Sequence, residues 1–442
     1  MLDERRFALS APATVHIEMT SGCNLRCRHC YNYWRAEDAP LDRLDRPTLD
    51  RIIDELAAAG VFHVILTGGE PLSHFDVTLH AVRRLTDLGF SLSMNSNLTL
   101  ATPDMMSRLR SAGLGHVLGS LLSPRPETHD FLASAPNTWR RMVRGIKTAL
   151  DAGLAVTNNM VVSQANHDQV HECGAFLKTL GVKGLTATRV SPPPYADEVL
   201  RSELRVGREE ARSILEQMIR VKQDFGLEIG ALLPFPLCFL DDFDRYADFA
   251  GRRCAGGIYT LSLNASGQAH ACQKEGLAVG GILEDGLSEV WARTRPWRTL
   301  GLLPDMCRSC EARAECGGGC RTVGLGYEGR LNGADNLALG PIARPLVTEA
   351  MWRRLGEHTL VFRSGMRFRA EDGFTLLNIR GAKNLMIDDG LAAFIRAASG
   401  AGRTFELTDV PETWRPALGH LYKRGAIELL EAEKRAEGGH GH

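Results

Sequence analysis

The first half of the chain alternates short apolar runs with amphipathic stretches. In the stretches, apolar residues recur every three to four positions, which is the spacing of a helix. The pattern predicts strands at residues 15–19, 61–66, 91–95, 116–120, 155–162 and 184–189, and helices at 49–56, 79–85, 138–152 and 168–180. Such strand–helix repeats predict an α/β fold with a parallel sheet, either doubly wound or a barrel. In both, the chemistry lies at the carboxyl ends of the strands.

Between residues 235 and 345 glycine and cysteine are dense and the predicted strands are short. Residues 258–264 alternate apolar and polar positions, and Ser266-Gly267 turns the chain back towards Cys272. This pattern predicts a hairpin between two cysteines. Because the region has little apolar core of its own, we expect metal to hold it together.

The last part of the chain is free of cysteine and regular again. Its pattern predicts strands at 360–368 and 374–379 around a turn at 371–373, helices at 388–399 and 413–424, and a strand at 426–430. This order predicts a winged-helix-like domain over 355–433, with 434–442 as a disordered tail. The preceding domains are expected at 12–230 and 235–345.

Composition narrows the class of protein. The 442 residues are 44% hydrophobic, as in a globular protein, and the formal net charge is −1, so no basic surplus points to nucleic acid or an anionic membrane. No stretch reaches the ~20 apolar residues of a membrane span, and no signal-peptide pattern occurs. We therefore expect a cytoplasmic protein, in which eleven cysteines favour metal over disulfides.

The sharpest motif is Cys23-x3-Cys27-x2-Cys30, directly after the first predicted strand. A four-iron cluster usually takes four thiolates, so three cysteines on one loop leave one iron open to a substrate or cofactor. A zinc knuckle with His29 as the fourth ligand is the alternative.

Residues 21–31, Ser-Gly-Cys-Asn-Leu-Arg-Cys-Arg-His-Cys-Tyr, resemble the signature of the radical S-adenosylmethionine (SAM) superfamily. The resemblance implies a partial (β/α)6 TIM-type barrel with a [4Fe–4S] cluster that reductively cleaves S-adenosylmethionine to a 5′-deoxyadenosyl radical. It also implies which residues bind the cofactor: Gly68, Gly69 and Glu70 at its ammonium, His29 beside its adenine, and Ser96, Asn97 and Ser120 nearby. Two positions depart from the family, since Leu122 stands where an aspartate is frequent and Ala133 where an arginine is usual.

A second cysteine group resembles the SPASM extension of this superfamily. It consists of Cys254-x12-Gly267-x4-Cys272 followed by Cys307-x2-Cys310-x5-Cys316-x3-Cys320. The resemblance implies one or two auxiliary [4Fe–4S] clusters. It assigns Cys254, Cys272 and Cys320 to the first, with Cys238 as its fourth ligand, and Cys307, Cys310 and Cys316 to the second. Taken alone, the second run of cysteines would also suit zinc.

The second auxiliary cluster is expected to lack a cysteine. Eight thiolates fill two cubanes, and even with Cys238 only seven cysteines lie beyond residue 200. Ala338 stands where the family's last cysteine is expected, and Asp335 is the nearest matched oxygen ligand. The alternative is a degenerate site that holds zinc or nothing.

By this resemblance we expect modification of a ribosomally made peptide, through a C–S or C–C crosslink or another side-chain change. The partners would be a precursor peptide and a flavodoxin- or ferredoxin-type electron donor. The final domain resembles the winged-helix peptide chaperones of pyrroloquinoline quinone biosynthesis, and would bind a leader peptide or only cap the fold.

Three other functions stay open. A sulfatase-type maturase is disfavoured by Gln273, since an amide cannot act as the base that the maturases' aspartate provides there. A peptide epimerase would need a hydrogen donor such as Cys173, for which the ordinary alternative is a buried core cysteine. A non-catalytic iron–sulfur protein would have no need of a Gly-Gly-Glu-Pro cofactor segment.

Overall fold

The chain forms two compact units, Met1–Arg344 and Pro345–His442. The structure is a computed structural model, and it describes residues 9–32, 41–193, 196–250, 252–343, 353, 355–380, 383–423 and 425–430. The predicted tail at 434–442 lies outside the described residues.

The first unit is built on one ten-stranded sheet, in the order β10-β9-β8-β1-β2-β3-β4-β5-β6-β7. Its seven sequential strands are β1 (Thr14–Glu18), β2 (His63–Thr67), β3 (Ser91–Asn95), β4 (His116–Gly119), β5 (Ala155–Val162), β6 (Gly184–Arg189) and β7 (Glu228–Gly230). Each pairs in parallel with the next. The predicted α/β fold with a parallel sheet is confirmed.

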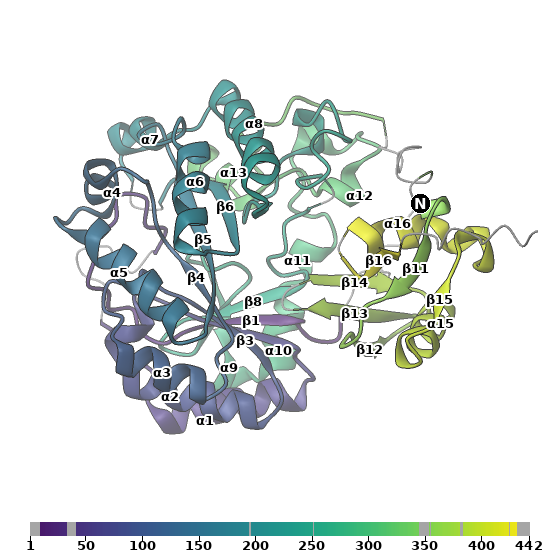
Figure 1. The fold of residues 1–442 in the computed structure, drawn as a ribbon, viewed down its shortest axis with the longest axis horizontal. Helices are drawn as coiled ribbons and strands as arrows, with labels where there is room; N and C mark the ends of the chain where they lie inside the picture. Colours follow the sequence, from purple (N-terminus) through teal and green to yellow (C-terminus); the bar gives the residue numbers. More distant parts are fainter. Residues whose placement is uncertain are drawn as a thin grey trace, which may run out of the picture. The chain divides into compact units, whose positions relative to one another are not determined.

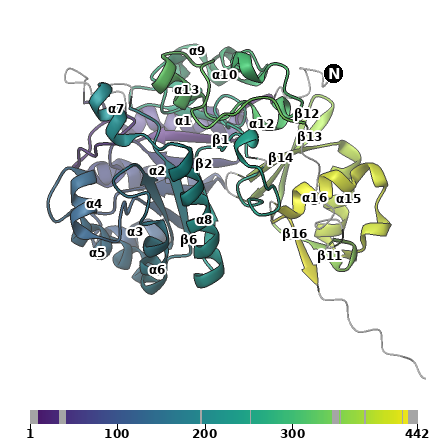
Figure 2. The same cartoon turned by 90° about the horizontal axis from the view of Figure 1, so that it is seen from above.

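Helices connect these strands and cover the outer face of the sheet (Figures 1 and 2). They are α1 (Arg46–Ala58), α2 (Phe75–Asp87), α3 (Pro103–Ser111), α4 (Pro126–Ala133), α5 (Thr138–Asp151), α6 (Val170–Leu180), α7 (Glu198–Leu204) and α8 (Arg208–Phe225). Helix α1 begins where Asp45 accepts a hydrogen bond from the Thr48 amide at 2.8 Å, and it buries Leu49, Ile52 and Leu56. Because parallel crossovers are right-handed, successive helices fall on one face, and the sheet curves into a partial barrel.

The cysteine-rich region continues the sheet of the barrel. Strand β8 (Thr260–Leu263) pairs in parallel with β1, and β9 (Gln268–His270) returns antiparallel to β8 as the predicted hairpin. Strand β10 (Ala278–Gly281) completes this edge. The sequence regions 12–230 and 235–345 therefore share one sheet.

Short helices hold the rest of the cysteine-rich region. They are α9 (Ile282–Asp285), α10 (Leu287–Arg293), α11 (Arg295–Arg298), α12 (Arg313–Cys316), α13 (Arg321–Glu328) and the 3-10 turns η4 (Leu237–Phe239) and η5 (Asp305–Cys307). The Trp291 indole of α10 is buried and donates to the carbonyl of Leu9 at 2.7 Å, which ties the region to the segment before β1.

The second unit contains two three-stranded antiparallel sheets, β15-β11-β16 and β12-β13-β14. Their strands are β11 (Thr359–Phe362), β12 (Arg367–Glu371), β13 (Phe374–Arg380), β14 (Lys383–Ile387), β15 (Thr404–Phe405) and β16 (Ile427–Leu430), and they accompany α15 (Asp389–Gly400) and α16 (Arg415–Lys423). Leu360, Leu377, Leu391 and Leu418 are buried in a common core. The unit therefore has an apolar core of its own.

The expected single strand at 360–368 is wrong. Residues 363–366 separate β11 from β12, and the two strands lie in different sheets. Gly365 has a φ of +77°, a conformation that strands do not use, so the chain turns there.

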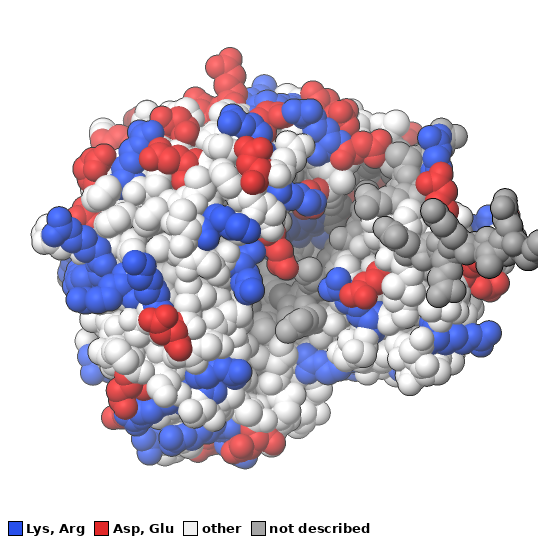
Figure 3. Space-filling model, viewed as in Figure 1, with Lys and Arg blue, Asp and Glu red and all other residues white. Residues whose placement is uncertain are grey.

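Charged side chains of both signs are mixed over the face drawn in Figure 3. Basic side chains gather most clearly over α5, whose sequence includes Arg140, Arg144 and Lys147. In the part of the chain that the structure describes, no helix is long and apolar enough to cross a membrane.

The packing of α5 on the turn after β3 yields a stability prediction. A Cβ added at Gly145 would lie 2.0 Å from the Leu98 carbonyl oxygen, so Gly145→Ala must displace this turn. We expect a loss of about 1–3 kcal/mol in the free energy of unfolding. Gly115→Ala is the matched control, because a Cβ there meets nothing within 4 Å. Equal unfolding midpoints for the two variants in urea would contradict this packing.

Candidate active site

Three cysteines lie on the loop that follows β1. The loop is anchored by Leu25, which packs in an apolar cluster with Leu132, while the Cys30 amide donates to the Cys27 carbonyl at 3.1 Å. Cys23, Cys27 and Cys30 themselves are only half-buried. The loop thus buries Leu25 as an apolar anchor and leaves its three cysteines half-buried.

The Gly-Gly-Glu segment after β2 packs directly on this loop. The Gly69 amide donates to the Thr20 carbonyl at 2.7 Å, and the Glu70 amide donates to the Gly22 carbonyl at 2.9 Å. A Cβ at Gly69 would stand 2.0 Å from the Gly22 oxygen, and Gly68 has a φ of +123°. Both glycines are therefore required by the close approach of two backbones.

The Glu70 side chain points into the protein. One carboxylate oxygen accepts hydrogen bonds from the Ser96 hydroxyl at 2.8 Å and the Leu72 amide at 3.0 Å, and the other accepts from the Asn97 amide at 2.8 Å. Burial raises the pKa of Glu70, and these hydrogen bonds oppose the shift. Glu70 thereby fixes Asn97, whose side-chain amide lies 3.8 Å from the Cys23 sulfur.

The remaining residues assigned from the family pattern lie at the same strand ends. His29 is half-buried on the cysteine loop, and Ser120 directly follows β4. The histidine and aspartate after them are structural: His129 Nδ1 accepts from the Leu122 amide at 3.1 Å, and Asp130 accepts from the first residues of α5. Burial lowers the pKa of His129 to about 4, so it is neutral and able to accept.

Sequence reasoning did not identify a polar wall made by Glu18, Tyr31 and Lys274. Glu18 is buried, and the Lys274 ammonium lies 5.2 Å from the centre of the Tyr31 ring. Burial, followed by the charges of Glu18, Cys30 and Cys272, raises the pKa of Tyr31 well above its usual value. Glu18 was detectable, because in a strand with Val15 and Ile17 on one face it falls on the opposite one.

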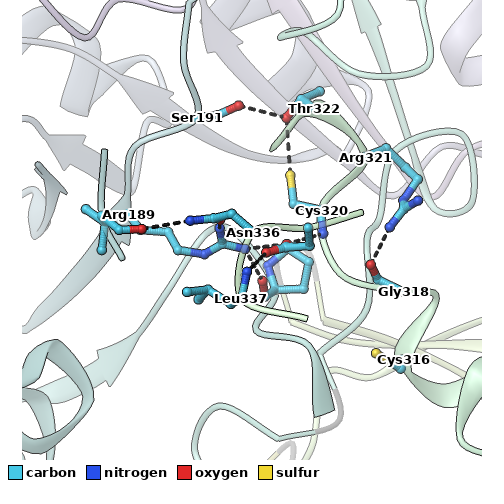
Figure 4. Close-up of polar contacts among 12 residues, drawn as sticks. Arg189, Ser191, Cys316, Gly318, Cys320, Arg321, Thr322, Asn336 and Leu337 are labelled. Carbon is cyan, nitrogen blue, oxygen red and sulfur yellow. Dashed lines mark hydrogen bonds and ion pairs between the residues drawn. The ribbon is translucent and has the colours of Figure 1, made fainter. Parts of the chain in front are cut away.

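The other cysteines fall into two groups, apart from Cys173. One cavity is lined by Cys238, Cys307, Cys310 and Cys316. In the other group, burial raises the pKa of Cys254 and of Cys272, and the nearby Cys320 raises both further. Figure 4 shows the sulfurs of Cys316 and Cys320 lying apart.

The assignment of Cys238 to the group of Cys254 is wrong. Cys238 lines the cavity of the second group, where burial raises the pKa of Cys307 and of Cys316 and the nearby Cys238 raises both further. Asp335, expected as an oxygen ligand of that group, instead accepts from the Cys320 amide at 2.8 Å.

A buried ion pair joins the barrel to the cysteine-rich region. The Arg189 guanidinium, at the end of β6, lies 2.5 Å from Asp335, and their side chains are 2% and 0% exposed. Arg189 also donates to the Pro234 carbonyl and the Asn336 side chain, each at 3.1 Å (Figure 4). The polar groups brought together here come from three segments of the chain, since Arg189 ends β6, Pro234 follows β7 and Asp335 is adjacent to Asn336.

Cys173 is buried inside α6, where burial raises its pKa to about 12. Its neighbour Gly174 packs on Val221 of α8. Cys173 therefore belongs to the apolar core, and the role of hydrogen donor is not supported.

The donor chemistry fits iron–sulfur clusters. Within the described residues, no three Cys, His, Asp or Glu side chains are close enough to hold a single metal ion. A four-iron cluster spreads its thiolates more widely than one ion does, and it compensates the charge of several buried sulfurs. The residues present thus suit a cluster at the cysteine loop and at each of the two further groups.

Comparison with known proteins identifies the family. Residues 17–177 match the radical SAM superfamily. The chain therefore carries a radical SAM domain and is an enzyme of that class. A PqqA peptide cyclase of Methylobacterium nodulans is 27% identical over 73% of this chain and 84% of its own length. An AdoMet-dependent heme synthase of Methanosarcina barkeri is 27% identical over 71% of this chain and 92% of its own.

Solved structures share the fold. The structure of Streptococcus suis SuiB superimposes with a TM-score of 0.62 at 16% identity, over 76% of this chain and 79% of that one. The structure of anSMEcpe with bound AdoMet and the Cp18Cys peptide gives 0.55 at 17%, over 70% and 89%. The expected partial barrel of this radical SAM enzyme agrees with both.

The cysteine loop yields an activity prediction. Cys27→Ala removes one of three thiolates from a site that already leaves one iron open, so about four irons per chain and all formation of 5′-deoxyadenosine from SAM should be lost. Cys173→Ala, in the core, is the control and should retain both. Normal cleavage by Cys27→Ala, followed by chromatography of the nucleoside, would refute the assignment of the loop.

The buried ion pair yields a second stability prediction. Asp335→Asn leaves the Arg189 charge uncompensated, and we expect a cost of about 3–5 kcal/mol in chemical unfolding. The control is Asp305→Asn, whose side chain is 73% exposed and pairs only with an exposed arginine at the surface. Asp335→Asn unfolding at the same urea concentration as the control would show that the pair contributes little.

Proposed function

We propose that this radical SAM enzyme modifies a ribosomally made peptide, using SAM, a [4Fe–4S] cluster on Cys23, Cys27 and Cys30, and auxiliary clusters on a SPASM-type extension. The observation that carries the proposal is the accessible three-cysteine loop held against the Gly68-Gly69 backbone and Asn97. When bound, the cluster and SAM supply the one-electron chemistry that gives a hydrogen-abstracting 5′-deoxyadenosyl radical.

In this proposal the chain's own residues bind and orient the cofactor. The Glu70 carboxylate is occupied by donors from the protein, so the Gly68-Gly69 backbone contacts the cofactor's ammonium while Glu70 positions Asn97. His29 lies beside the adenine, and Ser96, Asn97 and Ser120 complete the site. Their placement at the ends of adjacent parallel strands supports this arrangement.

The polar wall is the surface that we assign to the substrate. Glu18 comes from β1, Tyr31 from the cysteine loop and Lys274 from beyond Cys272, so a carboxyl, a phenol and an ammonium group meet there. A peptide, with its many amide donors and acceptors, suits such a wall.

Two substrate classes follow from the relatives, because one is a peptide cyclase and another a heme synthase. Peptides are favoured, since SuiB has been solved with its precursor peptide SuiA and anSMEcpe with a peptide bound. Gln273, where a maturase has an aspartate base, favours a crosslink or other side-chain change over sulfatase-type maturation.

The second unit is assigned to recognition of the precursor. We propose that it is winged-helix-like and binds a leader peptide by adding a strand to an exposed sheet edge. Its separate apolar core supports a domain with a function of its own. A flavodoxin- or ferredoxin-type protein would supply the electron.

The substrate class is tested by incubating the reduced enzyme with SAM and either a panel of precursor peptides or a tetrapyrrole. We expect a peptide to change mass by loss of hydrogen and to increase the yield of 5′-deoxyadenosine. Conversion of the tetrapyrrole alone, with all peptides unchanged, would replace the proposal by heme synthesis.

Removal of residues 345–442 tests the second unit. The truncated enzyme should still cleave SAM without substrate, because all eleven cysteines precede residue 345, but it should bind the precursor at least tenfold more weakly. Fluorescence anisotropy of a labelled precursor measures this, and a labelled core peptide without leader is the control. Unchanged affinity for the full precursor would make the unit a structural cap.

A further inference from the structure

Four cysteines from two distant stretches of the chain converge on one cavity of the first unit. Cys238 comes from η4, Cys307 from η5, Cys310 from the turn after it and Cys316 from the end of α12, and all four line the same cavity. Between Cys238 and Cys307 lie the whole β8–β9 hairpin and three helices. The convergence is therefore a product of the fold, not of sequence spacing.

Backbone amides surround the sulfurs in this cavity. The Leu339 amide donates to the Cys238 sulfur at 3.2 Å, and the amides of Leu237 and Ile342 donate to the sulfurs of Cys316 and Cys310, each at 3.4 Å. Amide donors stabilise a charged sulfur, and hydrogen bonds to the thiolates tune the potential of a cluster. The Cys238 sulfur thus accepts from a backbone amide, as do the sulfurs of Cys310 and Cys316 in the Cys-x2-Cys-x5-Cys motif.

Position 338 lies at this cavity too. Ala338 is one of its lining residues and directly precedes Leu339, the donor to Cys238. The family pattern places a cysteine at 338, whereas this chain has alanine there and an additional cysteine one hundred residues earlier. Both positions line the same cavity.

We propose that Cys238 is the fourth thiolate of the second auxiliary cluster, in place of the cysteine that the family pattern puts at position 338. This proposal rests on the proposed function only in assuming that the cavity holds an iron–sulfur cluster.

Asp335 does not compete for this role. One of its oxygens is engaged by Arg189 and the Cys320 amide, and the other accepts from the Leu337 amide at 3.1 Å. A carboxylate committed to a buried guanidinium cannot leave it without exposing that charge to an apolar interior.

The assignment has a consequence for the first auxiliary group. Cys173 lies in the core and the cysteine loop uses three more, so Cys254, Cys272 and Cys320 are the cysteines that remain. A cubane on these three has one iron without a cysteine ligand. The open position therefore moves from the second auxiliary cluster, where the sequence pattern predicts it, to the first, near Lys274.

The experiment counts iron and sulfide in anaerobically reconstituted full-length enzyme, without any peptide. Wild type should hold about 12 irons. Cys238→Ala leaves one iron of the second auxiliary cluster without a thiolate, so the Mössbauer spectrum of this cluster should change and the count should fall by about one to four irons. The double variant Cys238→Ala/Ala338→Cys should return to about 12, because residue 338 lines the same cavity. Cys173→Ala is the matched control and should keep the wild-type count.

A pairwise comparison places Cys238 in one cluster or the other. If it shares a cluster with Cys310, then Cys238→Ala/Cys310→Ala changes the spectrum of one cluster, whereas Cys238→Ala/Cys272→Ala changes the spectra of two. Mössbauer spectra should show the same cluster changed in the variants of Cys238 and Cys310.

Two results would overturn the proposal: a wild-type iron count and spectrum in Cys238→Ala, or a double variant at position 338 that is as depleted as Cys238→Ala. Because no substrate is present, failure of the peptide assignment would leave these counts unchanged, and the two failures are distinguishable.

Discussion

The buried ion pair of Arg189 and Asp335 is the interaction on which the arrangement of the first unit depends. Arg189 ends the sixth parallel strand, and Asp335 belongs to the segment that closes the cysteine-rich region. The same carboxylate oxygen accepts from the Cys320 amide, so the residue that pairs with the barrel arginine also positions a cysteine of one group. Two fully buried charges are stable only as a pair with further hydrogen bonds, and here the Pro234 carbonyl and the Asn336 side chain supply them. The pair therefore specifies how the extension folds onto the sheet.

A second constraint acts at the other side of the barrel. Gly69 and Gly22 approach so closely that no side chain fits between them, and the Glu70 carboxylate then holds the turn of Ser96 and Asn97 against the cysteine loop. Three strand ends are locked together by backbone contacts and one buried carboxylate. Leu25 is the buried anchor of the loop, and the three cysteines are only half-buried.

The periodic part of the fold was predictable from sequence. Strands β3, β5 and β6 begin and end where alternation and apolar runs place them. This is because the pattern of apolar and polar residues in a strand is set by its immediate neighbours in the sequence. The strand predicted at 360–368 failed because one glycine with positive φ, Gly365, divides it between two sheets.

The predicted grouping of the cysteines failed because it depends on contacts between distant parts of the chain. Cys238 lies sixteen residues before Cys254 in sequence, yet the chain brings it to Cys316, and nothing local reports that contact. Likewise, Asp335 has the chemistry of a ligand, and only its burial beside Arg189 shows that it is a structural anion.

The central claim is that the radical formed at the cysteine loop abstracts hydrogen from a peptide. Its most direct test is the transfer of deuterium from a precursor peptide with perdeuterated side chains, incubated with the reduced enzyme and unlabelled SAM. We predict that 5′-deoxyadenosine gains one mass unit, in proportion to the modified peptide formed. Unlabelled 5′-deoxyadenosine from every precursor tested, together with deuterium transfer from a labelled tetrapyrrole, would contradict the account.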